Sequence, residues 1–253
     1  MTRVFTATIA GALLWGAAGA SAALQSQAGT VRARAMPHYR TALEHMRAEA
    51  WPEAAQAFDR AIEIDPGFEM AYYGLGRALM PQKKFVNAIS AYGKCRDLYI
   101  AETGRQFTNQ HEAQRYRSDQ MVELDDVIRS YQQGPQTMQS AQVLRGLQER
   151  RNQLQQTMQR GANFSVMSTP VPAFVSLALG SAFFRAGRLL DAEREYKATI
   201  AADPKTGEAY SNLAVVYLQT ERFEEAEKAV KSAEKTGFKV NPMLKEDIAA
   251  KKR

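Results

Sequence analysis

The chain has very little of the chemistry that most enzymes and metalloproteins need. Its 253 residues include one cysteine, Cys95, and three histidines, His38, His45 and His111. A lone cysteine cannot form an internal disulfide, and the histidines lack metal-ligand spacing to cysteines or carboxylates. No serine lies in a nucleophile-elbow context, no glycine-rich phosphate loop is present, and no carboxylates are paired for acid–base work. We therefore expect no catalytic residues, no metal and no cofactor, and a protein that is not an enzyme.

Signals for β-structure are also missing. No alternation of apolar and polar residues stands out, and no hairpin dipeptide separates two apolar runs. We therefore expect an all-α chain whose stability comes from packing rather than from disulfides. Cys95 is expected to be a small buried hydrophobe.

What the sequence does contain is a spacing of 34 residues. A small residue, an aromatic four positions later and another small residue three positions after that recur at this interval. Pairs that share the spacing are Ala54 and Ala88, Phe58 and Tyr92, Ala61 and Cys95, Ala192 and Ala226, Leu179 and Leu213, and Pro170 and Pro204.

This pattern resembles the tetratricopeptide repeat family, over four repeats at 35–68, 69–102, 173–206 and 207–240. The family's Leu-Gly pair is matched by Leu75-Gly76 and by Leu179-Gly180, although Thr41-Ala42 replaces it in the first repeat. The resemblance covers a little over half of the chain. It implies a solenoid of helix-turn-helix units, arranged as one repeat pair at 35–102 and a second at 173–240, and a protein that holds other proteins.

The segment 103–172 between the pairs does not fit the repeat. Two apolar stripes at helical spacing, Met121–Leu124–Ile128–Tyr131 and Leu144–Leu147–Leu154–Met158, flank Gly134-Pro135. We expect two long helices, about 104–131 and 136–160, that form an antiparallel hairpin, followed by a linker to residue 172. Such a hairpin could pack on the repeats or dimerise as a coiled coil, and disorder is a weaker third option.

Both ends of the chain differ from the repeats. Residues 1–22 combine a short positive start, an apolar Ala-rich run and the small residues Ala20-Ser21-Ala22. They resemble a secretory signal peptide cleaved before Ala23, which predicts a periplasmic or secreted protein; an uncleaved inner-membrane anchor is the alternative.

Residues 241–253 are expected to form a basic tail or a capping helix. The chain stays net basic without the signal segment, but an exported protein rarely meets nucleic acid, so we expect no nucleic-acid partner and at most peripheral membrane contact.

The family resemblance places the partner-binding residues on the first helix of each repeat. In the family, these helices line a concave groove that takes a peptide. The candidates transferred here are Tyr39, Met70, Tyr73, Arg77, Phe174, Leu177 and Ser211. The groove would be mostly apolar, and the helical hairpin of the same chain could cover it. We expect an exported, non-enzymatic scaffold or adaptor that binds an unidentified protein or peptide through the groove or the hairpin. The alternative is a structural assembly protein that self-associates through residues 104–160 and has no peptide ligand.

Overall fold

A computed structural model describes residues 16–135, 137–159 and 170–252, with side chains from residue 31 onward, and these residues are all helix, turn or loop. The prediction of an all-α chain is confirmed. The helices are α1 (Gly16–Arg47), α2 (Trp51–Ile64), α3 (Glu69–Leu79), α4 (Phe85–Glu102), α5 (Gln110–Gln132), α6 (Met138–Gln159), α7 (Ala173–Arg185), α8 (Leu189–Ala202), α9 (Gly207–Gln219), α10 (Phe223–Lys235) and α11 (Pro242–Lys251).

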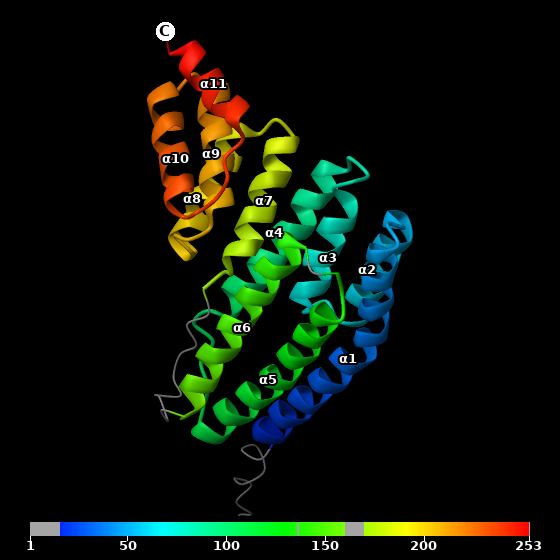
Figure 1. Ribbon diagram of the computed structural model, residues 1–253. Helices are drawn as coiled ribbons and strands as arrows, with labels where there is room; N and C mark the ends of the chain where they lie inside the picture. The colour runs from blue at the N-terminus through cyan, green and yellow to red at the C-terminus, as the bar shows by residue number, and fades with distance from the viewer. Residues whose placement is uncertain (1–15, 136, 160–169, 253) are drawn as a thin grey trace, which may run out of the picture.

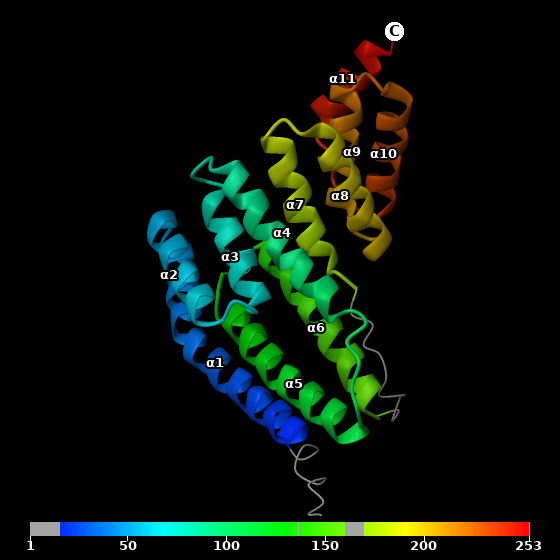
Figure 2. The ribbon, with the colours of Figure 1, turned by 180° about the vertical axis from the view of Figure 1, so that it is seen from behind.

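Eight of these helices form four antiparallel pairs that stack into one solenoid (Figure 1). We call α1, α3, α7 and α9 the A helices, and α2, α4, α8 and α10 the B helices. The second pair of repeats does not form a separate domain, because α4 packs directly against α7 (Figure 2). The interruption in the sequence is therefore not an interruption in the stack.

Small residues allow the helices of each pair to approach closely. Ala54, Ala88, Ala192 and Ala226 are all fully buried, as the repeat spacing predicts. The glycines of the Leu-Gly motif act in the same way. A Cβ added at Gly76 would lie 2.6 Å from the Tyr92 ring, and one added at Gly180 would lie 2.8 Å from the Tyr196 ring. In these two repeats the aromatic residue of the B helix thus fills the space that the glycine of the A helix leaves open.

The turns from A helix to B helix share one backbone conformation. Glu49, Lys83 and Glu221 have positive φ angles of 55°, 58° and 58°, and Gly187 occupies the equivalent position with φ 75°. A positive φ is unfavourable for residues with a side chain, and glycine adopts it freely. Three of the four turns therefore use a less favourable residue at this position.

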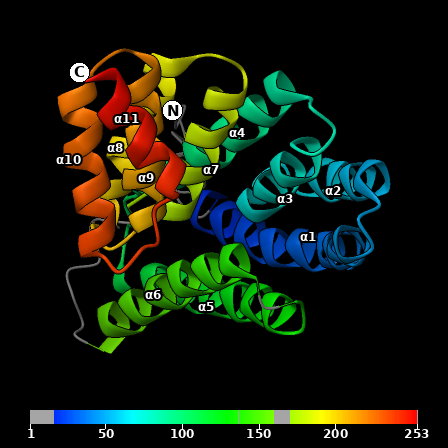
Figure 3. The ribbon, with the colours of Figure 1, turned by 45° about the horizontal axis from the view of Figure 1, so that its top comes forward.

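Helices α5 and α6 form an antiparallel hairpin that lies along the side of the stack formed by the A helices (Figure 3). The first of them starts later than the sequence suggested, at Gln110 instead of about residue 104. Gly104 has φ 87°, and the Asn109 side chain accepts a hydrogen bond from the Glu112 amide as the helix cap. The chain from Thr103 to Thr108 is therefore a loop.

The hairpin shares the hydrophobic core of the repeats. Leu124, Ile128 and Tyr131 of α5 and Leu144 and Leu147 of α6 are buried in the same apolar cluster as the repeat side chains. Of the outer ends of the two stripes, Met121 packs in a small second cluster, whereas Met158 remains exposed. The hairpin is thus a structural part of the solenoid.

The two ends of the chain contribute differently. Helix α11 packs on α10 through the buried side chains Leu244 and Ile248 and so covers the last repeat. Most of the proposed signal segment lies outside the described residues, and cleavage before Ala23 would fall within α1. Within the described part of the chain, no helix is both long and apolar enough to span a membrane.

Cys95 is a free, buried thiol, as predicted, and burial raises its pKa well above the ordinary value.

Candidate functional site

A cavity of about 1030 Å³ lies where the hairpin turn meets the A helices. Helices α1, α3 and α7 form its walls, and the turn around Gly134-Pro135 and the start of α6 close it from the other side. Its apolar lining includes Leu43, Met46, Trp51, Tyr73, Met80, Tyr92, Tyr131, Phe174 and Leu177. An apolar hollow of this size with a few polar groups is typical of ligand-binding sites.

Three aromatic rings meet in the wall of the cavity. The centroid of the Tyr73 ring lies 5.0 Å from that of Phe174 in an edge-to-face arrangement, and 5.6 Å from that of Tyr92. Tyr73 and Tyr92 belong to the first repeat pair and Phe174 opens the second. The cavity therefore lies over the junction between the two pairs.

Arg77 is one of two positively charged residues in the cavity wall, together with Arg47. It projects from α3, and its Nη1 lies 3.5 Å from the hydroxyl oxygen of Tyr131 on the hairpin. Burial lowers the pKa of Arg77, but the phenol groups of Tyr131, Tyr73 and Tyr92 raise it, and the balance is above the ordinary value. The guanidinium is therefore charged at any physiological pH.

The cavity brings together four of the seven predicted partner-binding residues: Tyr73, Arg77, Phe174 and Leu177. Tyr39 and Met70 lie outside this lining and are buried, with exposed fractions of 0% and 2%. A partner cannot reach them in this arrangement. Ser211 lies on α9 outside the cavity lining and is half-buried. Their assignment as contact residues remains a prediction.

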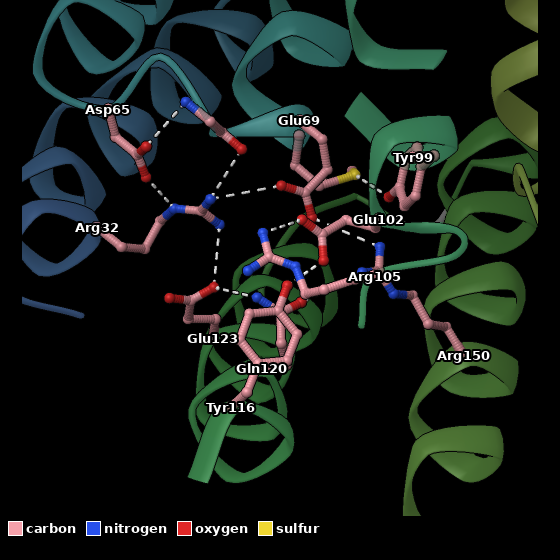
Figure 4. Close-up of polar contacts among 12 residues, drawn as sticks. Arg32, Asp65, Glu69, Tyr99, Glu102, Arg105, Tyr116, Gln120, Glu123 and Arg150 are labelled. Carbon is pink, nitrogen blue, oxygen red and sulfur yellow. Dashed lines mark hydrogen bonds and ion pairs between the residues drawn. The ribbon is translucent and has the colours of Figure 1, made fainter. Parts of the chain in front are cut away.

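A second polar feature fastens the hairpin to the first repeat pair (Figure 4). We call Arg32, Asp65, Glu69 and Glu123 the Arg32 cluster. Arg32 of α1 pairs with Asp65, lies 3.5 Å from Glu69 Oε2 of α3, and lies 3.3 Å from Glu123 Oε2 of α5. One guanidinium thus joins three carboxylates from three segments of the chain.

Arg150 of α6 extends this network on the far side of Glu69. Its Nη1 lies 3.6 Å from Glu69 Oε1, its Nη2 donates to Gln120 Oε1 at 3.2 Å, and its guanidinium stacks 4.7 Å from the centre of the Tyr99 ring. Gln120 in turn donates to Glu123 Oε2 at 3.2 Å. Both hairpin helices are therefore linked by polar contacts to Glu69 at the start of α3.

The Arg32 cluster contains three carboxyl groups and only one guanidinium. Burial raises the pKa of Glu123 to about 7; Arg32 opposes this rise, and Glu69, Asp65 and Asp119 add to it. Glu123 is therefore a carboxyl group that titrates near neutral pH where the hairpin contacts the repeats. No group of histidines, cysteines and carboxylates among the described residues could hold a metal ion.

Several residues of the site were not predicted from the sequence. Arg32, Glu123 and Arg150 are far apart in the chain, and their meeting depends on how the hairpin docks. Arg47 and Tyr131 also line the cavity unexpectedly. Arg47 follows Leu43 by four residues, so its place on the same face of α1 was visible in the helical spacing.

The two repeat regions also match a known family. The sequence profile of the tetratricopeptide repeat covers residues 39–94 and 177–237. In these two stretches the chain matches the tetratricopeptide repeat family. The profile leaves out the hairpin segment, so the tetratricopeptide solenoid here carries an insertion of a different kind.

Solved tetratricopeptide structures resemble the chain at low identity. YrrB, described as a tetratricopeptide protein with an unusual peptide-binding site, is 18% identical over 87% of this chain and 92% of its own, with a TM-score of 0.29. PilW, a type IV pilus biogenesis factor, is 15% identical over 86% and 85%, with a TM-score of 0.40. A thermophilic tetratricopeptide protein of Thermus thermophilus is 21% identical over 86% and 98%, with a TM-score of 0.32. These scores carry no argument about the role of this chain. No curated protein sequence matches it.

Proposed function

We propose that this protein is a non-enzymatic adaptor that holds a segment of a partner protein in the cavity between the A helices and the hairpin turn. The observation that supports this most is the cavity itself, an apolar hollow of about 1030 Å³ lined by Tyr73, Phe174 and Leu177, with Arg77 in its wall. Tyrosine and arginine are enriched among the residues that dominate binding energy at interfaces. Tetratricopeptide repeats, moreover, are a protein-binding architecture.

A site-specific crosslinker tests this proposal. We expect a photoreactive phenylalanine analogue in place of half-buried Trp51, which lines the cavity, to crosslink to a partner protein in cells. The matched control carries the same analogue at Leu190 on α8, which is 77% exposed and lies outside the cavity lining. Equal crosslinking from both positions, or from neither, would contradict a partner site in the cavity.

Self-association through the hairpin is the second candidate function. Val122 on α5 and Met138 on α6 are 64% and 67% exposed, so the hairpin keeps apolar side chains available to a second copy. Sedimentation of the purified chain separates the two candidates, because only the assembly function requires the chain to self-associate. If a dimer forms and Val122→Glu dissociates it, the assembly function is favoured.

We further propose that the protein is exported, to the periplasm or out of the cell, and that the mature chain begins at Ala23. The composition of residues 1–22 supports this. N-terminal sequencing of protein from the exported fraction should give Ala23 as the first residue. Recovery of the intact N-terminus from the membrane fraction would instead indicate an anchor.

A further inference from the structure

The charge of Arg77 is not neutralised within the described part of the chain. Its one side-chain hydrogen bond there is the long contact to Tyr131, and no carboxylate forms an ion pair with it. Charged groups removed from bulk water are normally paired, because an unpaired charge loses much of its solvation. An arginine in this state, facing a hollow large enough for a ligand, indicates that the ligand supplies the counter-charge.

The chain's own helix α5 shows how this face of the solenoid binds a segment. Along α1, Arg32 lies 3.3 Å from Glu123 and Arg40 lies 3.9 Å from Asp126. Further along α5, the groups that contact arginines are no longer carboxylates. Arg47 reaches the Ser130 carbonyl oxygen at 3.2 Å, and Arg77 reaches only the Tyr131 hydroxyl. The first two arginines thus meet acidic residues, whereas the two that line the cavity do not.

The acidic residues that line the cavity do not change this balance. Glu208 accepts a hydrogen bond from Gln142 Nε2 at 2.9 Å, and Glu49 is exposed in the turn after α1. Neither forms an ion pair with Arg77 or Arg47. Around Arg77 the walls are apolar, with Tyr73, Tyr92 and Phe174 nearby.

We propose that the partner segment held in the cavity is apolar and carries a carboxylate that binds the Arg77 guanidinium beside the Tyr131 hydroxyl. This inference rests on the proposed function and specifies the chemistry of the partner. The guanidinium offers a planar set of N–H donors that matches a carboxylate, and the tyrosine hydroxyl adds a further donor. The apolar residues on either side of the carboxylate fill the space between Met80, Phe174 and Leu177.

The experiment is a selection of random dodecapeptides displayed on phage, with the full chain immobilised as bait. We expect the enriched peptides to share an aspartate or glutamate flanked by large apolar residues. In one enriched peptide, this acid is then changed to the corresponding amide. The amide should bind about ten- to a hundredfold more weakly, because a hydrogen-bonded ion pair that is shielded from water is lost.

Variants of the protein locate the effect. Against Arg77→Met, the acid and amide peptides should bind equally, within about twofold, because the partner of the carboxylate is gone. Arg60→Met, an exposed position on α2, is the matched control and should keep the full preference for the acid. Circular dichroism checks that each variant folds. If Arg77→Met does not fold, the acid-to-amide comparison on the wild-type chain and on Arg77→Lys decides the question.

The outcomes separate this inference from the proposed function. If peptides are enriched but their binding does not depend on the acid or on Arg77, a partner site exists and the carboxylate inference is wrong. If no peptide is enriched, both are wrong. Acid-dependent binding that Arg77→Met abolishes and Arg60→Met retains supports both.

Discussion

The two repeat pairs are built alike inside but differ on the face they turn toward the hairpin. The same slot of the A helix holds Tyr39, Tyr73, Leu177 and Ser211 in the four successive repeats. The first three are 0%, 1% and 6% exposed, whereas Ser211 is half-buried. In the first three repeats this slot is therefore packed, and the last repeat leaves it in contact with solvent. The region between these extremes, around Arg77 and Phe174, combines apolar lining with open space.

The largest expected effect on this comparison comes from truncating a side chain that is packed in this slot. Tyr73→Ala should lower the free energy of unfolding by about 3–5 kcal/mol, because it removes a buried aromatic side chain and leaves a hole. Ser211→Ala at the equivalent slot should change it by less than about 0.5 kcal/mol. Urea denaturation of both variants measures the difference. Similar values for the two would show that Tyr73 is not packed in solution as it is in this arrangement.

The second effect concerns the contact of Glu123 on the hairpin with the first repeat pair, whose contribution to stability depends on pH. The pKa of Glu123 is 4.5 in the unfolded chain and about 7 in the fold. Between these values the carboxyl of Glu123 holds a proton in the folded protein but not in the unfolded chain, so the contribution of Glu123 to stability should fall as pH rises through this window and be level outside it. The loss is on the order of 3 kcal/mol.

Glu123→Gln should remove this contribution. We expect the variant to gain stability relative to the wild type as the pH rises from 5 to 8, measured by urea denaturation at each pH. A difference between the two proteins that stays constant across this range would mean that Glu123 does not titrate at the hairpin contact.

The third effect is a loss of stability that should be equal in the two pairs, because their A and B helices pack in the same way. Gly76→Ala and Gly180→Ala each place a Cβ against the ring of a B-helix tyrosine and should cost about 1–3 kcal/mol. Gly93 provides the control, because a Cβ there has no neighbour within 4 Å. Gly93→Ala should be neutral or gain up to about 1 kcal/mol from helix propensity. Thermal melts of the three variants are sufficient, and an unchanged melting temperature for Gly180→Ala would place the second pair outside this packing scheme.

The smallest effect distinguishes the turns within the pairs. Gly187→Ala should cost about 1 kcal/mol because its φ is positive, and Lys83→Gly and Glu221→Gly should each gain a few tenths to about 1 kcal/mol. The gain is limited because glycine also increases the entropy of the unfolded chain. Melting temperatures that move in the opposite directions would argue against the observed turn geometry.

The interior of each repeat could be predicted from the sequence because its determinants are local. The small residues Ala54 and Ala192 and the aromatics four positions later contact helices within the same repeat, so a fixed spacing reveals them. The two stripes around Leu124 and Leu147 likewise predicted the hairpin helices. The first begins later than the stripe predicts, because an apolar stripe does not mark a helix end and the start is set by the polar cap Asn109.

The site itself was predicted only in part, for a physical reason. Tyr73, Arg77 and Phe174 were named from their places on the A helices, but which of them are covered depends on where the hairpin docks. That docking is set by pairs such as Arg32 with Glu123 and Arg150 with Glu69, which join distant segments and leave no periodic trace in the sequence. The cavity is the space that this docking leaves open, and so it could not be located before the arrangement was known.

The direct contact of α4 with α7 has a consequence for how the chain reaches its native state. In an ordinary solenoid, each new layer closes onto its neighbour across a turn such as the four residues between α2 and α3. Here the two layers must meet across the segment 103–172, which costs about 2–3 kcal/mol more in loop-closure entropy if that segment is still flexible. Prior folding of α5 and α6 would shorten this search by bringing the two ends of the segment together. The insertion would then act as a guide during assembly, and the protein would fold from two nuclei that join last at the wall of the cavity.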